Sequence, residues 1–557
     1  MSKANARNGA NILLEVLETE GVEYIFGNPG TTELPLMDAL IDHPDIHYVL
    51  GLQEASVVAM ADGYAQASGK PGFINLHTAG GLGHGMGNLL NAYTSGTPLV
   101  VTAGQQDSRH AITDPLLQGD LVSIAKPACK WSAEITSAEQ IPVLAHRAFQ
   151  DSQATPPGPV FLSLPMNVME ESSTIQTSDI SHVDRRPVAH SLPELAAELA
   201  AIAPGKVAII AGDEISANDA YKEVVELAEI LAAPVFGSSW PAHIPYPTSH
   251  YLWQGNLPTR AADIATAMEE FDCVFALGGK SFITILYSED SALPDDCELF
   301  QLSVDGRDLG RTFPSKLSVV GDIEFSLKEL NQLLKEKVAA RSDQYAAQRD
   351  VLKQTFTNRK QTLYKAAREV EANPVIHPLV AARELVAAIG QTPIVDEAIA
   401  TAAHVRAFLQ NDYTRQYSFL RGGALGWGMP AAVGFSLGLG RKPVVSLVGD
   451  GAAMYSPQAL WTAMNENVPV TFIVINNLEY NVLKNFMRSQ PDYNSTRTGK
   501  FIAMDLIDPA IDFLALAKSM GMKAQKITKA TDIQALVAAG ITCSEPNMIE
   551  IVVSAEH

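Results

Sequence analysis

The sequence contains few cysteines, and no pair of them has the spacing of a metal or redox motif. The four thiols, at Cys129, Cys273, Cys297 and Cys543, lie far apart, and no Cys-x-x-Cys occurs. We therefore expect reduced and mostly buried cysteines. The pattern excludes a disulfide framework and a zinc site built from cysteine ligands.

The sequence also lacks an excess of basic residues and any long apolar run. Lys and Arg number 40 against 62 Asp and Glu, which gives a formal net charge of −22. Binding to nucleic acid or to an anionic membrane would need basic patches, so neither partner is expected. No run of about 18 apolar residues could span a membrane, and the N-terminal segment has no apolar signal-peptide core. We expect a cytoplasmic protein.

Short apolar runs alternate with helical patterns along the whole chain. Runs such as 98–104 (PLVVTAG), 206–212 (KVAIIAG) and 469–475 (PVTFIVI) are rich in Val, Ile and Leu. Such runs are typical of strands that are buried on both faces of a parallel sheet, and the helices between them favour βαβ crossovers. The predicted fold class is therefore α/β, with doubly wound domains and parallel sheets.

Length and two linker-like stretches predict three domains. A chain of 557 residues holds about three domains of ordinary size. Residues 176–194 are polar with little periodicity, and residues 333–377 are charged and predict a solvent-facing helix. The expected domains are residues 1–180, 190–335 and 365–557.

Two polar side chains follow successive strand-like runs near the C-terminus. Asp450 lies in Gly449-Asp450-Gly451 after one apolar run, and Asn477 follows the next run, 27 residues further on. The carboxyl ends of neighbouring parallel strands lie together, so both side chains can reach one ion. Mg²⁺ prefers about six oxygen ligands, and the backbone carbonyl of Glu479 is a candidate third protein ligand.

An isolated Gly-Asp-Gly is often an ordinary turn, and Asn is a common turn former. The complete pattern is more specific, because Gly-Asp-Gly is followed by 25 residues and then by Asn477 at the end of a second apolar run. This pattern matches the thiamin diphosphate motif. We interpret Asp450 and Asn477 as ligands of a metal ion that holds a diphosphate.

Thiamin diphosphate chemistry also requires an acid at the pyrimidine end of the cofactor. A carboxyl group that protonates the aminopyrimidine favours the imino tautomer, which then removes the weakly acidic C2 proton. Glu54 fits this role, because it follows an apolar strand and starts a helix of small residues. The alternative is a first-turn glutamate that interacts favourably with the helix dipole.

Four segments carry a resemblance to a known family: FGNPGTTELPLMDAL, LQEASVVAMADGYAQASGKPGFINLHTAGGLGHGMGNLLNAY, PLVVTAGQQD and GDGAAMYSPQALWTA. They resemble the benzoylformate decarboxylases, within the thiamin-diphosphate decarboxylase and acetohydroxyacid synthase superfamily. The resemblance implies pyrimidine-binding, central and diphosphate-binding domains. It implies thiamin diphosphate with Mg²⁺, or Ca²⁺ in the same site. It also implies a homo-oligomer, as a dimer of dimers, in which Glu54 of one subunit faces Asp450 and Asn477 of another.

The resemblance also assigns roles by motif. Thr31 occupies a serine position whose hydroxyl binds the substrate carboxylate, and His77 matches the active-site histidine, so the expected catalytic residues are Glu54, His77 and Thr31. Gly423 would accept a hydrogen bond from the cofactor's 4′-amino group, and Leu425 would bend the cofactor. The expected cofactor-binding residues are Gly423, Leu425, Asp450, Gly451, Ala452, Asn477, Tyr480 and Thr401, and the metal ligands are Asp450, Asn477 and Glu479.

Structural alternatives remain open for three of these residues. His77 could be a strand-end histidine that is satisfied by its neighbours, Thr31 could cap a helix, and Leu425 could pack in the core. His84 replaces an asparagine of the family, and we assign it no role.

The expected substrate pocket departs from the family pattern. The family has a second histidine in the central domain, a proton-transfer candidate, and Ile285 occupies that position in our alignment. Val482 stands where the family has a smaller residue, whereas Phe419 and Phe486 keep apolar bulk that suits an aromatic or branched side chain. The expected pocket residues are Thr31, His77, Phe419, Val482, Phe486 and Ile285.

These features predict the non-oxidative decarboxylation of a small 2-oxo acid, with benzoylformate giving benzaldehyde and carbon dioxide as the first choice. One alternative is a carboligase of the acetohydroxyacid synthase type, which joins the decarboxylated intermediate to a second carbonyl compound. Loss of the second histidine would favour it if protonation is slowed. Such enzymes often carry FAD, and no persuasive flavin motif is present. Another alternative is a non-catalytic cofactor-binding paralogue, against which the intact Glu54, Asp450 and Asn477 argue.

Overall fold

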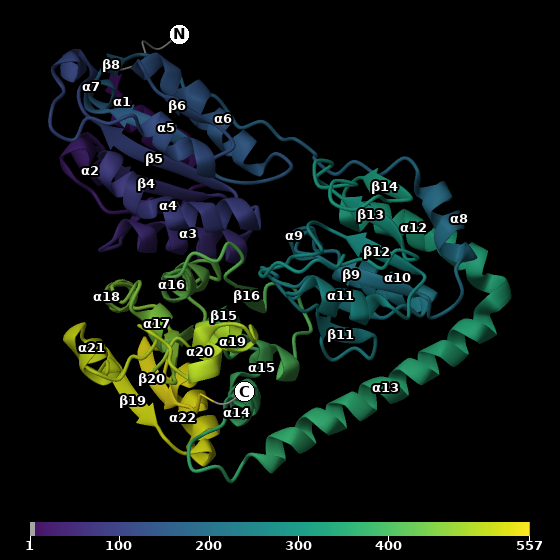
Figure 1. Ribbon diagram of the computed structural model, residues 1–557. Helices are drawn as coiled ribbons and strands as arrows, with labels where there is room; N and C mark the ends of the chain where they lie inside the picture. Colours follow the sequence, from purple (N-terminus) through teal and green to yellow (C-terminus); the bar gives the residue numbers. More distant parts are fainter. Residues whose placement is uncertain (1–5, 556–557) are drawn as a thin grey trace.

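The protein is built from three six-stranded parallel sheets with helices between the strands (Figure 1). The computed structural model describes residues 6–555. The strands of the three sheets span residues 24–165, 207–320 and 394–552. None of the helices in residues 6–555 is both long enough and apolar enough to cross a membrane. The predicted α/β fold class with parallel sheets is confirmed.

The N-terminal sheet has the strand order β3-β2-β4-β5-β7-β6. Its strands are β2 (Tyr24–Gly27), β3 (His47–Leu50), β4 (Gly72–His77), β5 (Leu99–Gln105), β6 (Ser132–Glu134) and β7 (Val160–Pro165). The α-helices of this part are α1 (Gly9–Thr19), α2 (Leu34–Ala39), α3 (Glu54–Ser68), α4 (Thr78–Ser95), α5 (Leu121–Ala125), α6 (Ile141–Gln153) and α7 (Met166–Glu170). Two short strands, β1 (Arg7–Asn8) and β8 (Ser172–Ser173), pair antiparallel.

The central sheet has the order β11-β10-β9-β12-β13-β14, which is the 3-2-1-4-5-6 order of a dinucleotide-binding fold. Its strands are β9 (Val207–Ala211), β10 (Val235–Gly237), β11 (Trp253–Asn256), β12 (Cys273–Leu277), β13 (Glu298–Ser303) and β14 (Leu317–Val320). Its helices are α8 (Leu192–Ala201), α9 (Glu214–Ala217), α10 (Tyr221–Leu231), α11 (Ala261–Met268) and α12 (Ile323–Val338).

A long helix, α13 (Ser342–Glu369), runs along the outside of the molecule and leads to the C-terminal sheet (Figure 1). Only three of its residues are buried, as expected for the charged stretch that forms it: Tyr345, Leu352 and Ala367. Short 3₁₀ turns complete the connections: η1 (Thr31–Glu33), η2 (Leu40–Asp42), η3 (Ser108–Thr113), η4 (Lys126–Ala128), η5 (Ala138–Gln140) and η6 (Ala339–Arg341).

The C-terminal sheet has the order β16-β15-β17-β18-β20-β19. Its strands are β15 (Ile394–Glu397), β16 (Tyr417–Phe419), β17 (Val444–Gly449), β18 (Val470–Asn476), β19 (Lys523–Ile527) and β20 (Asn547–Val552). Its helices are α14 (Pro378–Ile389), α15 (Ala402–Phe408), α16 (Gly428–Gly438), α17 (Asp450–Ala453), α18 (Ala459–Glu466), α19 (Asn481–Arg488), α20 (Asn494–Thr498), α21 (Phe513–Ser519) and α22 (Ala530–Thr542).

The N-terminal and C-terminal sheets are joined by the packing of α3 against α16 (Figure 1). Two glycines allow the backbones to touch, because a Cβ on Gly63 would lie 2.1 Å from the Ala431 carbonyl oxygen and one on Gly434 would lie 1.8 Å from the Met60 carbonyl oxygen. Both helices are almost wholly buried. The helix that begins with Glu54 is therefore held rigidly against the C-terminal domain.

Candidate active site

Asp450 lies at the carboxyl end of β17, where it begins α17. Its Oδ1 accepts a hydrogen bond from Gly451 N and its Oδ2 accepts one from Leu478 N, both at 2.7 Å. The residue is 5% exposed. Burial, together with the nearby Glu479 carboxylate, raises the pKa of Asp450 to about 6. A buried carboxylate beside a second negative charge is an environment that a cation would stabilise.

The turn after β18 brings Asn477 and Glu479 to the same place. Leu478, whose backbone N–H reaches Asp450, has a φ of 62°, a left-handed conformation that is uncommon outside glycine. Asn477 Oδ1 accepts a hydrogen bond from Glu479 N at 3.1 Å, which tightens the turn. The Glu479 side chain turns to Lys484, which also binds Asp505 at 2.6 Å. The two predicted metal side chains are thus tied to one turn.

The predicted ion site is not a cluster of acidic or imidazole groups. Within residues 6–555, no group of three or more His, Cys, Asp or Glu side chains is arranged to hold a metal ion. The predicted set differs in kind, because it uses one carboxylate, one amide oxygen and one backbone carbonyl. Oxygen ligands of these types suit Mg²⁺, which also takes oxygens from water and phosphate.

Some of the remaining predicted cofactor residues of this domain lie beside Asp450, and others lie in separate loops. Gly451 lies against the Tyr480 ring, since a Cβ there would lie 2.3 Å from Tyr480 Cε1 and would require the ring to move. Ala452 is buried in the same turn of α17, and Thr401 is buried at the start of α15, after the neighbouring strand β15. Gly423, whose φ is 81°, is exposed in the loop between β16 and α16, and Leu425 is half-buried there.

Glu54 is the first residue of α3, and its carboxylate has two polar neighbours. Asn28 Nδ2 donates to Glu54 Oε1 at 3.3 Å, and His84 Nδ1 lies 3.1 Å from Glu54 Oε2. The Glu54 side chain is 12% exposed, whereas that of His84 is 66% exposed. No role was predicted for His84, so its contact with Glu54 is a feature that sequence reasoning missed.

His77 ends β4 and is held by a buried glutamate. Glu33 Oε2 lies 2.8 Å from His77 Nδ1, and Thr32 Oγ1 lies 3.1 Å from the same nitrogen. Glu33 also accepts backbone hydrogen bonds from Gly30 and Gly104, both at 2.9 Å. The carboxylate therefore favours a proton on Nδ1, which leaves Nε2 as the nitrogen available for proton exchange.

Thr31 begins the turn η1, and its side chain is exposed. Within residues 6–555 it makes no hydrogen bond, whereas the next residue, Thr32, donates to Glu33 Oε1 at 2.8 Å. The sequence analysis missed Thr32 and Glu33. A signal existed for Glu33, because a carboxylate three residues after Gly30 has the spacing of a capping box, and its Oε2 accepts from Gly30 N.

The predicted substrate-pocket residues do not all lie in one place. Val482 and Phe486 are half-buried on α19, four residues apart, and so share one face of that helix. Phe419 is 1% exposed, with its ring enclosed by Trp240 and Arg406. Ile285 is 43% exposed in the central domain. In the described chain, no hydrogen bond, ion pair or ring contact links Ile285 or Phe419 to Glu54, His77 or Asp450.

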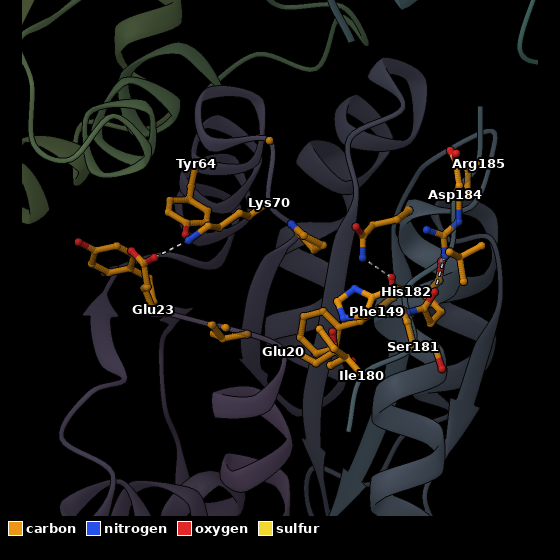
Figure 2. A pocket seen from close by; sticks show the side chains of 18 of the residues that line it. Glu20, Glu23, Tyr64, Lys70, Phe149, Ile180, Ser181, His182, Asp184 and Arg185 are labelled. Atoms are coloured by element: carbon orange, nitrogen blue, oxygen red, sulfur yellow. Dashed lines mark hydrogen bonds and ion pairs between the residues drawn. The ribbon is translucent and has the colours of Figure 1, made fainter. Parts of the chain in front are cut away.

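A cavity of about 690 Å³ lies away from the predicted site residues. It is formed between the N-terminal domain and residues 180–186, which belong to the segment between β8 and α8. Figure 2 shows Glu23, Tyr64 and Lys70 on one side of it and Phe149 and His182 on the other. None of the predicted site residues lines this cavity. Its size therefore does not identify the site of the chemistry.

Three family models match the chain in order. They are thiamine pyrophosphate enzyme, N-terminal TPP binding domain (residues 7–123), thiamine pyrophosphate enzyme, central domain (196–330), and thiamine pyrophosphate enzyme, C-terminal TPP binding domain (398–551). The first segment contains Glu54, and the second contains the central sheet. The third contains Asp450 and Asn477.

Curated and solved relatives cover almost the whole chain. The chain is 32% identical to benzoylformate decarboxylase of Pseudomonas aeruginosa, over 96% of this chain and 97% of that protein. It is 26% identical to a probable acetolactate synthase large subunit of Methanococcus aeolicus, over 98% and 92%. The solved benzoylformate decarboxylase of Polynucleobacter necessarius superposes with a TM-score of 0.86 at 28% identity, over 99% of each chain.

Proposed function

The chain belongs to the thiamine pyrophosphate enzyme family, and from this premise we propose that it decarboxylates an aromatic 2-oxo acid, with benzoylformate as the first candidate. The products would be carbon dioxide and the corresponding aldehyde. The observation that carries the proposal is the buried Asp450 carboxylate, tied to the Asn477–Glu479 turn, in a chain that matches a benzoylformate decarboxylase over nearly its full length.

The residues around Asp450 fit the diphosphate end of the cofactor. Asp450 and Asn477 would hold the Mg²⁺ ion through their side chains, and Glu479 through its carbonyl. The fit is supported by the chemistry of the site, since every hydrogen-bond partner of Asp450 is a backbone N–H and no cationic side chain neutralises it in the described residues. When bound, thiamin diphosphate supplies a nucleophilic carbon and an electron sink for the loss of carbon dioxide.

The side chains from the N-terminal domain would perform the proton transfers. Glu54 would hold the proton that the aminopyrimidine ring receives, and Asn28 helps to orient its carboxylate. His77 would exchange a proton through Nε2, because Glu33 binds its Nδ1. Thr31 would orient the substrate carboxylate with its exposed hydroxyl. Val482 and Phe486 would form the apolar wall that keeps water from the reacting carbon.

A carboligase is the second candidate function. It is favoured by Ile285, which cannot transfer a proton at the position where the family has its second histidine. The match to an acetolactate synthase subunit is weaker, at 26% identity. The crevice of the central sheet does not favour the diphosphate of a flavin, because the Glu214 carboxylate lies there and accepts hydrogen bonds from Ser303 Oγ at 2.8 Å and Val304 N at 2.9 Å.

We propose a homo-oligomer, a dimer of dimers, with active sites between subunits. Large apolar side chains on the surface support association, since Ile112, Leu116 and Ile502 are 91%, 86% and 87% exposed. A cytoplasmic location remains our prediction.

The test is carbon dioxide release from a panel of benzoylformate, phenylpyruvate, pyruvate and branched 2-oxo acids, with and without thiamin diphosphate and Mg²⁺. We expect cofactor-dependent release, with the highest kcat/KM for benzoylformate. Glu54→Ala should reduce kcat by at least about 10²- to 10⁴-fold, the usual contribution of a proton-transfer group. Analysis of the products for 2-hydroxy ketones separates decarboxylation from carboligation.

The matched control for Glu54→Ala is Glu194→Ala. Glu194 is also a first-turn glutamate, exposed on α8 of the central domain, so its removal costs a helix-dipole interaction without touching the site. We expect the control to keep full activity. If Glu54→Ala released carbon dioxide as fast as the control, the proposed role of Glu54 would be wrong.

A further inference from the structure

The loop between β16 and α16 is held by one side chain from the N-terminal domain. Asn91, near the end of α4, donates from Nδ2 to the Ala424 carbonyl oxygen at 2.8 Å and accepts at Oδ1 from Ala424 N at 3.0 Å. It is 1% exposed. A single amide thus satisfies both backbone groups of the residue between Gly423 and Leu425, the two positions proposed to contact the cofactor.

The contact is close and is anchored on both sides. A Cβ on Gly422 would lie 2.4 Å from Asn91 Oδ1 and 2.5 Å from Asn91 Cα, so only glycine fits there. Asn91 Nδ2 also donates to Asn88 Oδ1 at 2.7 Å, and Asn88 Nδ2 donates to the carbonyl of Ala55 at 2.8 Å. Ala55 directly follows Glu54, so this hydrogen-bond chain reaches from the start of α3 to the loop.

The far end of the loop is held differently. Glu397, at the end of β15, accepts hydrogen bonds from Gly426 N at 2.6 Å and Gly428 N at 2.7 Å. These groups begin α16, whose N-cap residue Trp427 provides no side-chain cap. Glu397 therefore has a sufficient structural role as a helix cap. Asn91 caps no helix at this contact, because Ala424 belongs to no helix or strand.

The contact with Asn91 fixes the orientation of the two peptide groups on either side of Ala424. In a trans peptide, the carbonyl of one residue points opposite to the N–H of the next. Because the Ala424 N–H points to Asn91, the Gly423 carbonyl points away from α4. Because the Ala424 carbonyl also points to Asn91, the Leu425 N–H points away from α4. The two peptides around Ala424 are thereby fixed in orientation.

We propose that Asn91 is a positioning residue, which sets the direction of the Gly423 carbonyl and the placement of Leu425 for the cofactor. The inference rests on the proposed function, since it takes Gly423 and Leu425 as cofactor contacts. Removing Asn91 lets the loop rotate, so that the cofactor still binds through the Asp450 region but its amino group is held poorly for C2 deprotonation.

The test compares Asn91→Ala, Asn91→Asp and a control, Asn331→Ala. Asn331 is a buried asparagine on α12 of the central domain that also donates to a backbone carbonyl, that of Glu223 at 2.9 Å. The Tm of the cofactor-free protein and the Kd for thiamin diphosphate with Mg²⁺ are measured on the full chain. The rate of proton–deuterium exchange at C2 of the bound cofactor is measured by NMR after acid quench. Steady-state assays give kcat and KM.

Both alanine variants should lower the Tm, and only Asn91→Ala should slow C2 exchange, on the order of 10- to 100-fold. The kcat should fall by the same factor, with KM and Kd within about threefold of wild type, because ground-state binding is kept. Asn91→Asp should give an exchange rate between those of Asn91→Ala and wild type, because it still accepts from Ala424 N but can no longer donate to the Ala424 carbonyl as an ionised carboxylate.

C2 exchange in Asn91→Ala at the wild-type rate would overturn the proposal, as would equal slowing in Asn331→Ala. If the alanine variant does not fold, Asn91→Ser, which is too short to reach both backbone groups, is measured in its place with the same expectation. A wild-type protein that neither binds thiamin diphosphate nor accelerates C2 exchange would instead refute the proposed function. The wild-type measurement thus separates the two failures.

Discussion

The N-terminal and C-terminal sheets share one strand order. They differ in the side chains that lie in the crevice at the carboxyl ends of their strands. In chain order, each sheet runs 2-1-3-4-6-5, as β3-β2-β4-β5-β7-β6 and as β16-β15-β17-β18-β20-β19. A buried glutamate follows or ends the first strand of each sheet, Glu33 in η1 after β2 and Glu397 at the end of β15. Glu33 accepts backbone hydrogen bonds from Gly30 and from Gly104 in β5, and Glu397 accepts them from Gly426 and from Gly428 in α16. Each sheet therefore uses a buried carboxylate to hold neighbouring backbone.

The third strand of each sheet ends in different chemistry. In the N-terminal sheet β4 ends at His77, which Glu33 binds through Nδ1. In the C-terminal sheet β17 ends at Gly449 and is followed by Asp450, which faces only backbone N–H groups. One crevice thus presents an imidazole, for which we propose proton transfer, and the other presents a carboxylate suited to a cation. A shared topology supplies the crevice, and the residue at the strand end decides its use.

Asp450→Asn should have the largest effect on cofactor binding, because it removes the negative charge from the crevice of the C-terminal sheet. The Kd for thiamin diphosphate with Mg²⁺ should rise by more than the roughly 10- to 100-fold that follows loss of an outer-shell partner, because a direct ligand is weakened. Titration calorimetry at several Mg²⁺ concentrations measures it.

The same substitution should have a smaller effect on the cofactor-free protein. The amide removes a buried charge that has no cationic partner among the described residues, but it accepts only one of the two backbone hydrogen bonds that Asp450 accepts, so the Tm should change little. A lower Tm together with an unchanged Kd would contradict the assignment of Asp450 as a metal ligand.

The second prediction addresses the N-terminal crevice through Glu33→Gln. The amide no longer fixes the proton on His77 Nδ1, so kcat should fall on the order of 10- to 100-fold. The matched control is the same change in a His77→Ala background, where we expect little further loss, because residues that act as a unit are not additive. Equal losses in both backgrounds would show that Glu33 acts only on the loops.

The sequence predicts the sheets and the strand-end residues well, because both are local patterns. The runs at 98–104, 206–212 and 469–475 correspond to β5 (99–105), β9 (207–211) and β18 (470–476) within one residue. Asp450 and Asn477 were identified at strand ends for the same reason. The domain limits and the roles of the site residues stay predictions.

Contacts between distant segments could not be predicted in this way. Asn91 and Ala424 are 333 residues apart, and nothing in either local sequence indicates their pairing. The choice between Thr31 and Thr32 as the neighbour of His77 depends on the geometry of η1, which adjacent identical residues do not reveal. The missed residues are thus those whose partners are set by tertiary packing or by the exact geometry of a short turn.

The central sheet sharpens the comparison, because a carboxyl group of its own, that of Glu214, binds groups at the carboxyl end of β13. Burial raises the pKa of Glu214 to about 7, and the carboxyl group binds Ser303, which ends β13, and Val304, which follows it. The folded protein therefore holds this proton more tightly than the unfolded chain, whose glutamate has a pKa of about 4.3. The contribution to stability is complete below the unfolded pKa, and it is lost as the pH rises through about 7.

The smallest effect is therefore expected from Glu214→Gln, a neutral residue of the same shape that can still bind Ser303 and Val304. Between about pH 5 and 7 the wild-type Tm should fall more steeply than that of the variant. Over this range only the wild type releases a proton from residue 214 when it unfolds. Thermal unfolding at intervals across this range measures the difference. The matched control is Glu194→Gln, because an exposed glutamate should leave the slope unchanged. Parallel slopes for wild type and Glu214→Gln would show that the folded protein does not raise the pKa of Glu214, and the expected difference from an exposed glutamate would be wrong.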